Sequence, residues 1–124
     1  MPSQPVPALD HTLLALADPV RRGVVELLKD HPRRAGELAA SLGTSAPVMS
    51  KHLKVLRASA LVEAERDATA DARVRVYRLR PERFEELRGW LEDVSTFWTD
   101  QLASFKRAAD AAAREEPRRR GTSR

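Results

Sequence analysis

The chain has 124 residues, of which 42% are hydrophobic and 32% charged, which is typical of one globular domain and includes no apolar run long enough to span a membrane. It contains no cysteine, which excludes disulfides, thiolate metal sites and cysteine nucleophiles; with no secretory-signal pattern at the N-terminus, we expect a cytoplasmic protein. The formal charge is +4, and residues 114–124 alone hold five arginines against two glutamates. The nearly neutral remainder can still bind nucleic acid if its basic residues cluster on one face.

The first part of the chain predicts a flexible arm and two helices. Residues 1–7 hold three prolines and are expected to form the arm. Residues 8–17 place apolar side chains at helical spacing, namely Leu9, Leu13, Leu16 and Ala17. Asp18 and Pro19 are typical of a helix start. The helix after them is expected to bury Val20, Val24, Leu27 and Leu28, to expose Arg21, Arg22 and Glu26, and to pack closely at Gly23.

A second pair of helices has the layout of a helix-turn-helix motif. Residues 35–42 predict a short helix that ends at Gly43, a residue suited to the left-handed conformation. Ser45 can cap the next helix, about 46–58, and Pro47 fits its first turn. A helix, a glycine-containing turn and a helix with a basic face are typical of a DNA-reading unit.

The helix about 46–58 has two chemically different sides at about 100° per residue. The apolar side is expected to face the core, and it consists of Met49, Leu53 and Leu56, with His52 as a hydrogen-bonded structural residue. The other side offers small residues near its start and cations further along, which suit phosphates. Ser50 and Lys51 are the candidates for base edges. The predicted DNA contacts of this region are Thr44, Ser45, Ala46, Pro47, Ser50, Lys51, Lys54 and Arg57.

Two valine-rich segments after this helix predict a β-wing. They are VEAER, which follows Leu61, and RVRVYRL, with a polar, alanine-rich linker between them. Tyr77 and Leu79 share one parity and are expected to face the body, although alternation alone does not decide the facing. The wing arginines Arg66, Arg73 and Arg75 are either DNA contacts or solvated loop charges, and the sequence favours neither.

A long helix is predicted from Pro81 to about residue 113. Its apolar residues step by three or four over about three heptads, with Trp90 and Phe97 beside the stripe. So wide a stripe exceeds what a small winged domain can cover, so we expect association with a second copy. The expected organisation is therefore an arm (1–7), a winged helix-turn-helix domain (8–113) and a disordered basic tail (114–124).

Three segments resemble the arsenical-resistance-repressor (ArsR) family of winged helix-turn-helix transcription factors. They are LADPVRRGVVELL at 16–28, GELAASLGTSAPVMSKHLKVLRASALV at 36–62, and VYRLRP at 76–81. The resemblance implies a mainly α fold with a small β-wing, and a homodimeric repressor of a near-palindromic operator. It also implies a dimer interface made by the first and last helices, for which the expected residues are Leu9, Leu13, Leu91, Val94, Trp98, Leu102 and Phe105.

Departures from the family pattern indicate a branch without metal. The family usually has glycine where this chain has Ala60, and a positive φ there would cost about 1 kcal/mol. The cysteines of thiophilic-metal sensors are absent, and no histidine follows His52 to complete a zinc site. We therefore expect no metal and no cofactor, and leave a small-molecule effector open.

Three other functions are alternatives to the DNA-binding repressor. An enzyme is not expected, because the three histidines are dispersed and no phosphate-binding glycine loop occurs. A dimeric winged-helix interaction module that has lost DNA binding remains an alternative. A sensor that uses Asp10 and His11 is another, although adjacent helical residues point about 100° apart and chelate poorly.

Overall fold

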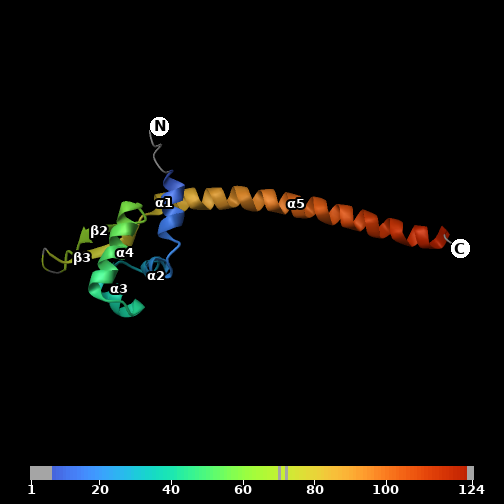
Figure 1. Ribbon diagram of the computed structural model, residues 1–124. Coiled ribbons are helices and arrows are strands. Elements are labelled where there is room, and N and C mark those ends of the chain that lie inside the picture. The colour runs from blue at the N-terminus through green and yellow to red at the C-terminus, as the bar shows by residue number, and fades with distance from the viewer. Residues whose placement is uncertain (1–6, 70, 72, 123–124) are drawn as a thin grey trace, which may run out of the picture. The chain divides into compact units, whose positions relative to one another are not determined.

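The computed structural model describes residues 7–69, 71 and 73–122, with side chains described as far as Glu115. The predicted arm lies almost entirely outside these residues. Two compact units divide the chain, Met1–Leu87 and Arg88–Arg124. The elements (Figure 1) are α1 (Ala8–Ala15), α2 (Pro19–Leu28), β1 (Arg33–Arg34), α3 (Ala35–Leu42), α4 (Ala46–Ala58), β2 (Val62–Arg66), β3 (Arg75–Leu79) and α5 (Pro81–Thr122). The predicted fold class, mainly α with a small β-wing, is confirmed.

The start of α2 is fixed by its cap, as predicted. The Asp18 carboxylate accepts hydrogen bonds from the backbone N–H groups of Val20 (2.8 Å) and Arg21 (3.1 Å), and Pro19 occupies the first helical position. The hydrogen bond from the Arg21 backbone is the main reason that the pKa of Asp18 lies below its usual value. The predicted close contact at Gly23 is also present, because a Cβ there would lie 2.7 Å from Leu42 Cδ2.

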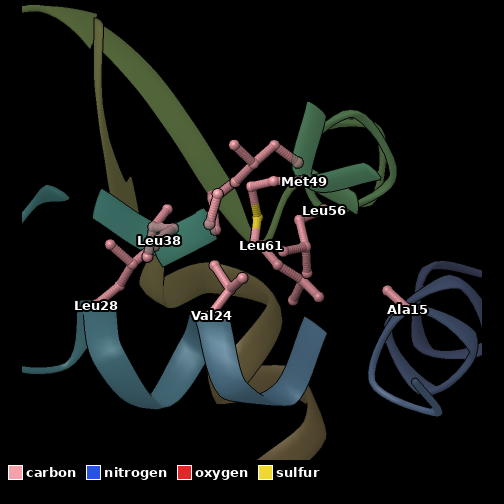
Figure 2. Close-up of a cluster of buried hydrophobic side chains, with 10 residues drawn as sticks. Ala15, Val24, Leu28, Leu38, Met49, Leu56 and Leu61 are labelled. Atoms are coloured by element: carbon pink, nitrogen blue, oxygen red, sulfur yellow. The ribbon is translucent and has the colours of Figure 1, made fainter. Parts of the chain in front are cut away.

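The core of the first unit gathers side chains from four helices and the wing. Figure 2 shows the side chains of α2, α3 and α4 pointing toward one another. The apolar residues that recur at helical spacing on each helix thus face the core, which confirms the predicted core side of α4. The buried hydrophobic residues are Ala15, Val24, Leu28, Leu38, Ala39, Met49, Leu53, Leu56, Leu61 and Val62.

The sheet has three antiparallel strands in the order β1-β3-β2. Strand β1 was not predicted, because two residues carry no alternation pattern and become a strand only by pairing with Tyr77 and Val76. Strand β3 begins at Arg75, two residues later than expected. The expectation that Tyr77 and Leu79 face the body is confirmed, since both pack against the core.

Ala60 ends the turn after α4 in the left-handed conformation, with φ = 59°. The Leu61 N–H donates to Leu56 O and the Ala60 N–H to Arg57 O, both at 3.0 Å, which is the Schellman arrangement. Gly43 ends α3 in the same way, with φ = 65°. An alanine therefore occupies a conformation that glycine adopts without a Cβ penalty.

Replacing Ala60 by glycine should stabilise the protein by about 1 kcal/mol, because the left-handed strain disappears. For a chain of this size that corresponds to a melting temperature about 4 °C higher, measured at fixed protein concentration. The matched change is Gly43→Ala. An added Cβ there would meet nothing within 4 Å, so only the strain of the positive φ acts, and the protein should lose a similar amount of stability. An Ala60→Gly protein that melts at or below the wild-type temperature would refute the strain.

Helix α5 is continuous in backbone from Pro81 to Thr122. It therefore enters the segment 114–124, for which we predicted disorder. The alanine-rich residues just before this segment and the glutamates at its start are good helix formers. Phe84, in the first unit, packs against the core as part of this helix. No helix among the described residues is long and apolar enough to cross a membrane.

The second unit exposes four of the five α5 residues that we predicted for a dimer interface, namely Leu91, Trp98, Leu102 and Phe105. Trp98 is 57% and Phe105 74% exposed, and the rings of Phe97 and Trp98 meet edge to face with centroids 5.7 Å apart. No described side chain in residues 88–115 is buried, and Val94 alone is half-buried. This face has nothing to cover it within its own unit.

Candidate nucleic-acid interface

The position of α4 follows from the turn that precedes it. Gly43 closes α3, and the Ser45 hydroxyl accepts a hydrogen bond from the Val48 N–H at 3.3 Å, which starts α4. Pro47 lies in the first turn, where its missing N–H has no intrahelical acceptor to serve. Buried Met49, Leu53 and Leu56 then fix the rotation of the helix about its axis.

That rotation exposes nearly all of the predicted contacts on α4. The exposed set is Ser45, Ala46, Pro47, Ser50, Lys51, Lys54 and Arg57. Thr44 differs, because its hydroxyl oxygen is buried and has no hydrogen-bond partner among the described residues. The helix therefore presents small residues at its start and cations along its later turns, as the sequence predicted.

The cations on this surface have no ion pair among the described residues. Residues 38–62 contain no aspartate or glutamate. Among the described residues, no ion pair involves the cations of α4 or the wing, which are Lys51, Lys54, Arg57, Arg66, Arg73 and Arg75. Several other arginines, in contrast, meet carboxylates, as Arg34 does at Asp67 and Arg78 at Glu63 and Glu65.

Two wing arginines lie directly opposite each other. Arg66 of β2 is the register partner of Arg75 of β3. Like charges in directly opposite positions destabilise a sheet. Because strand side chains alternate, Arg66 and Arg75 share a sheet face with the pair Ala64 and Tyr77. The wing thus retains an unfavourable pair on the face that adjoins the core.

The other face of the wing carries the acidic residues and their partners. Arg78 donates to the carboxylate of Glu63 and also pairs with Glu65, which raises the pKa of Arg78 above its usual value. Arg80 Nε lies 3.9 Å from Glu63 Oε2. The sheet therefore separates a face whose arginines have no ion pair among the described residues from a face whose arginines pair with glutamates.

A groove lies between the later turns of α4 and strand β3. Ser50, Lys54 and Arg57 form one wall, at spacings of four and three residues, so they lie on one side of the helix. Tyr77 contributes from β3. Among the described residues no carboxylate lines the groove, and those that line it are Ser50, Leu53, Lys54, Arg57, Ala58 and Tyr77.

The outer end of the wing strands is held by Asp67, a residue that no sequence pattern indicated. The Asp67 carboxylate accepts hydrogen bonds from the Thr69 hydroxyl and N–H and from Arg34 Nε and Nη2, the last at 2.7 Å. The Thr69 hydroxyl contributes most to lowering the pKa of Asp67 to about 2. Asp67 therefore stays ionised at neutral pH and ties the strand end of β2 to β1.

His52 joins α4 to the elements before it. Arg21 Nη1 lies 3.4 Å from His52 Nδ1, within hydrogen-bond distance. Arg21 also donates through Nε to Ala15 O at 2.7 Å. The expectation of a half-buried, hydrogen-bonded structural histidine is confirmed, whereas the prediction that Arg21 lies outside is wrong, because it spans α1 and α4.

No group of three or more histidine, aspartate or glutamate residues in the described part of the chain could hold a metal ion. Asp10 and His11, the candidate pair for a sensor, are both exposed on α1.

Known proteins that resemble this chain share its fold and are transcriptional regulators. A helix-turn-helix domain family matches residues 16–65. The HTH-type transcriptional regulator Rv2034 of Mycobacterium tuberculosis is 41% identical over 102 residues, which cover 82% of this chain and 89% of that protein. The HTH-type transcriptional repressor SmtB of the same species is 38% identical over 65 residues, or 52% of this chain and 48% of that one. A solved ArsR-like transcriptional regulator from Rhodococcus sp. RHA1 has 28% identity and a TM-score of 0.68, covering 84% of this chain and 92% of that chain.

Proposed function

We propose that this chain, which belongs to the ArsR family of winged helix-turn-helix, DNA-binding transcriptional regulators, acts as a homodimeric repressor of a near-palindromic operator. Its relatives are regulators and not enzymes. Helix α4 would enter the major groove, and the wing would contact the adjoining backbone. The two copies would place two such helices on successive half-sites.

The observation that carries this proposal is the set of unpaired cations on α4 and the wing. Among the described residues, Lys51, Lys54 and Arg57 have no carboxylate partner, and the wing keeps Arg66 opposite Arg75. A surface that served stability alone would gain from an acidic residue at one of these positions. Phosphates would supply the missing negative charge and release counterions on binding.

The dimer rests on the exposed apolar residues of α1 and α5. Leu13 on α1 is 41% exposed, and Trp98 and Leu102 on α5 are more so. An amphipathic helix draws most of its stability from packing its apolar face. A second copy of the same chain would supply that packing symmetrically, and the symmetry would match an inverted repeat in the DNA.

Lys54→Ala tests the phosphate contact. The affinity for duplex DNA should fall, and the slope of log K against log salt should lose about 0.9 for each copy of Lys54 that contacts phosphate. Lys29→Ala is the matched control, because Lys29 is an exposed lysine already paired with Glu26 at 3.1 Å. Both variants change the net charge equally. An equal loss of slope in both would show that the effect comes from net charge and not from the location of Lys54.

Gel shift of the wild-type protein with its own promoter region decides between this proposal and the interaction module. A protein–DNA complex that survives competitor DNA is expected. A folded dimer that shows no shift with duplex DNA, even at about 50 mM salt where phosphate contacts are strongest, would favour the module.

A further inference from the structure

The groove between α4 and β3 has the chemistry of an anion site. Lys54 and Arg57 bring two cations to it, and Ser50 brings a hydroxyl from the same side of the helix. All three side chains are exposed, and no ion pair engages either cation among the described residues. Since no described residue of the lining is a carboxylate, none of them competes with an incoming anion.

Tyr77 gives this groove a donor at a fixed position. The residue packs against the hydrophobic core, and it also lines the groove. No hydrogen bond within the described part of the chain engages its hydroxyl, which is absent from the buried polar atoms that lack a partner. A phenol held by core packing loses little rotamer freedom on binding, so a hydrogen bond from it costs little entropy.

The register of the wing extends the same surface. Tyr77 is followed along its sheet face by Arg75, which stands opposite Arg66. From the domain outward, this surface therefore presents the apolar core, then the groove with its hydroxyls and cations, and then Arg75 and Arg66. A chain of regularly spaced anions running from α4 to the wing would meet each of these groups in turn.

We propose that this groove seats a phosphodiester of the DNA backbone, with the Tyr77 hydroxyl donating to a phosphate oxygen between Lys54 and Arg57. Ser50 then serves the backbone rather than a base edge, and base reading is left to Lys51, which lies about 120° around α4 from Arg57. This inference rests on the proposed DNA binding and adds Tyr77 to it. A free phosphate compound would satisfy the same donors, so the test includes it.

Tyr77→Phe removes the hydroxyl and keeps the ring in the core. A hydrogen bond to a charged acceptor is worth about tenfold in affinity. We expect duplex DNA to bind about tenfold more weakly at fixed salt, with an unchanged salt slope because no charge is lost. Arg57→Ala should instead reduce the slope, by about 0.9 for each copy in contact. An unchanged melting temperature for Tyr77→Phe confirms that the effect comes from the hydroxyl.

Tyr77 is the only tyrosine, so one 3-fluorotyrosine label gives one ¹⁹F resonance from the groove. We expect that resonance to shift on adding a duplex of about 30 base pairs, and not on adding inorganic phosphate at millimolar concentration. A shift with phosphate and none with DNA would overturn the proposal in favour of a small-anion site. Equal DNA affinity of wild type and Tyr77→Phe would overturn it as well.

These failures are distinguishable from failure of the proposed function. If wild-type protein binds no duplex DNA, the DNA-binding proposal itself is wrong, and this inference falls with it. If wild type binds, Lys54→Ala weakens binding and Tyr77→Phe does not, then only the role of Tyr77 is wrong.

Discussion

Replacing Trp98 by aspartate should convert the proposed homodimer into a monomer and lower the affinity for its proposed operator at least 100-fold. Trp98 is 57% exposed in the single chain. Burying such a side chain at an interface is worth about 1.5–3 kcal/mol, and each dimer would lose two. The new carboxylates would also be buried without a partner, which adds a larger penalty. A monomer engages one half-site, so the gain from linking two contacts disappears.

Solution mass by sedimentation equilibrium and DNA binding by gel shift measure this result together. Thr96→Asp is the matched control, because it adds the same charge on an exposed residue about 160° around the helix from Trp98. The control should remain dimeric and bind normally. A Trp98→Asp protein that keeps both its mass and its affinity would show that α5 does not form the interface.

Arg75→Glu should stabilise the fold and nearly abolish DNA binding. Glutamate opposite Arg66 would replace like-charge repulsion with a cross-strand ion pair, and such pairs change stability by about 0.2–1 kcal/mol. On DNA, each copy would lose a phosphate contact and place a carboxylate near the backbone. We expect an affinity loss of about 100-fold at 0.1 M salt and a salt slope lower by about 0.9 per copy.

Arg78→Glu makes the contrast, because it changes the charge equally on the same strand but on the opposite sheet face. Arg78 pairs with Glu63 and Glu65, so its reversal should lower the melting temperature and leave most of the DNA affinity intact. The two variants thus move stability and binding in opposite directions. If Arg75→Glu binds DNA as the wild type does, the wing plays no part in binding.

The elements that the sequence predicted well are those whose signals are local. Asp18 caps α2, Gly43 ends α3 and Ser45 starts α4, and each acts on backbone groups within a few residues. The predicted core side of α4 followed from its own periodicity. The resemblance to a family also indicated in advance that Ala60 occupies a position where glycine is usual.

The features that were missed depend on residues far apart in the chain. Strand β1 exists only because Arg33 and Arg34 pair with β3, and Arg34 reaches Asp67 across 33 residues. Arg21 looked like a surface residue on its own helix, yet it bridges α1 and His52. Tyr77 was expected to face the body, and only the fold, which lines one groove with Tyr77 and the later turns of α4, shows its second role.

Selection of bound DNA from a random pool tests the central claim most directly, because it reports binding, specificity and dimer geometry together. The account predicts enriched inverted repeats whose half-site centres lie about one helical turn apart, roughly 10–10.5 base pairs, or a multiple of it. A pool that shows no enrichment, or one enriched for a single unpaired half-site, would contradict a homodimer that binds through two copies of α4.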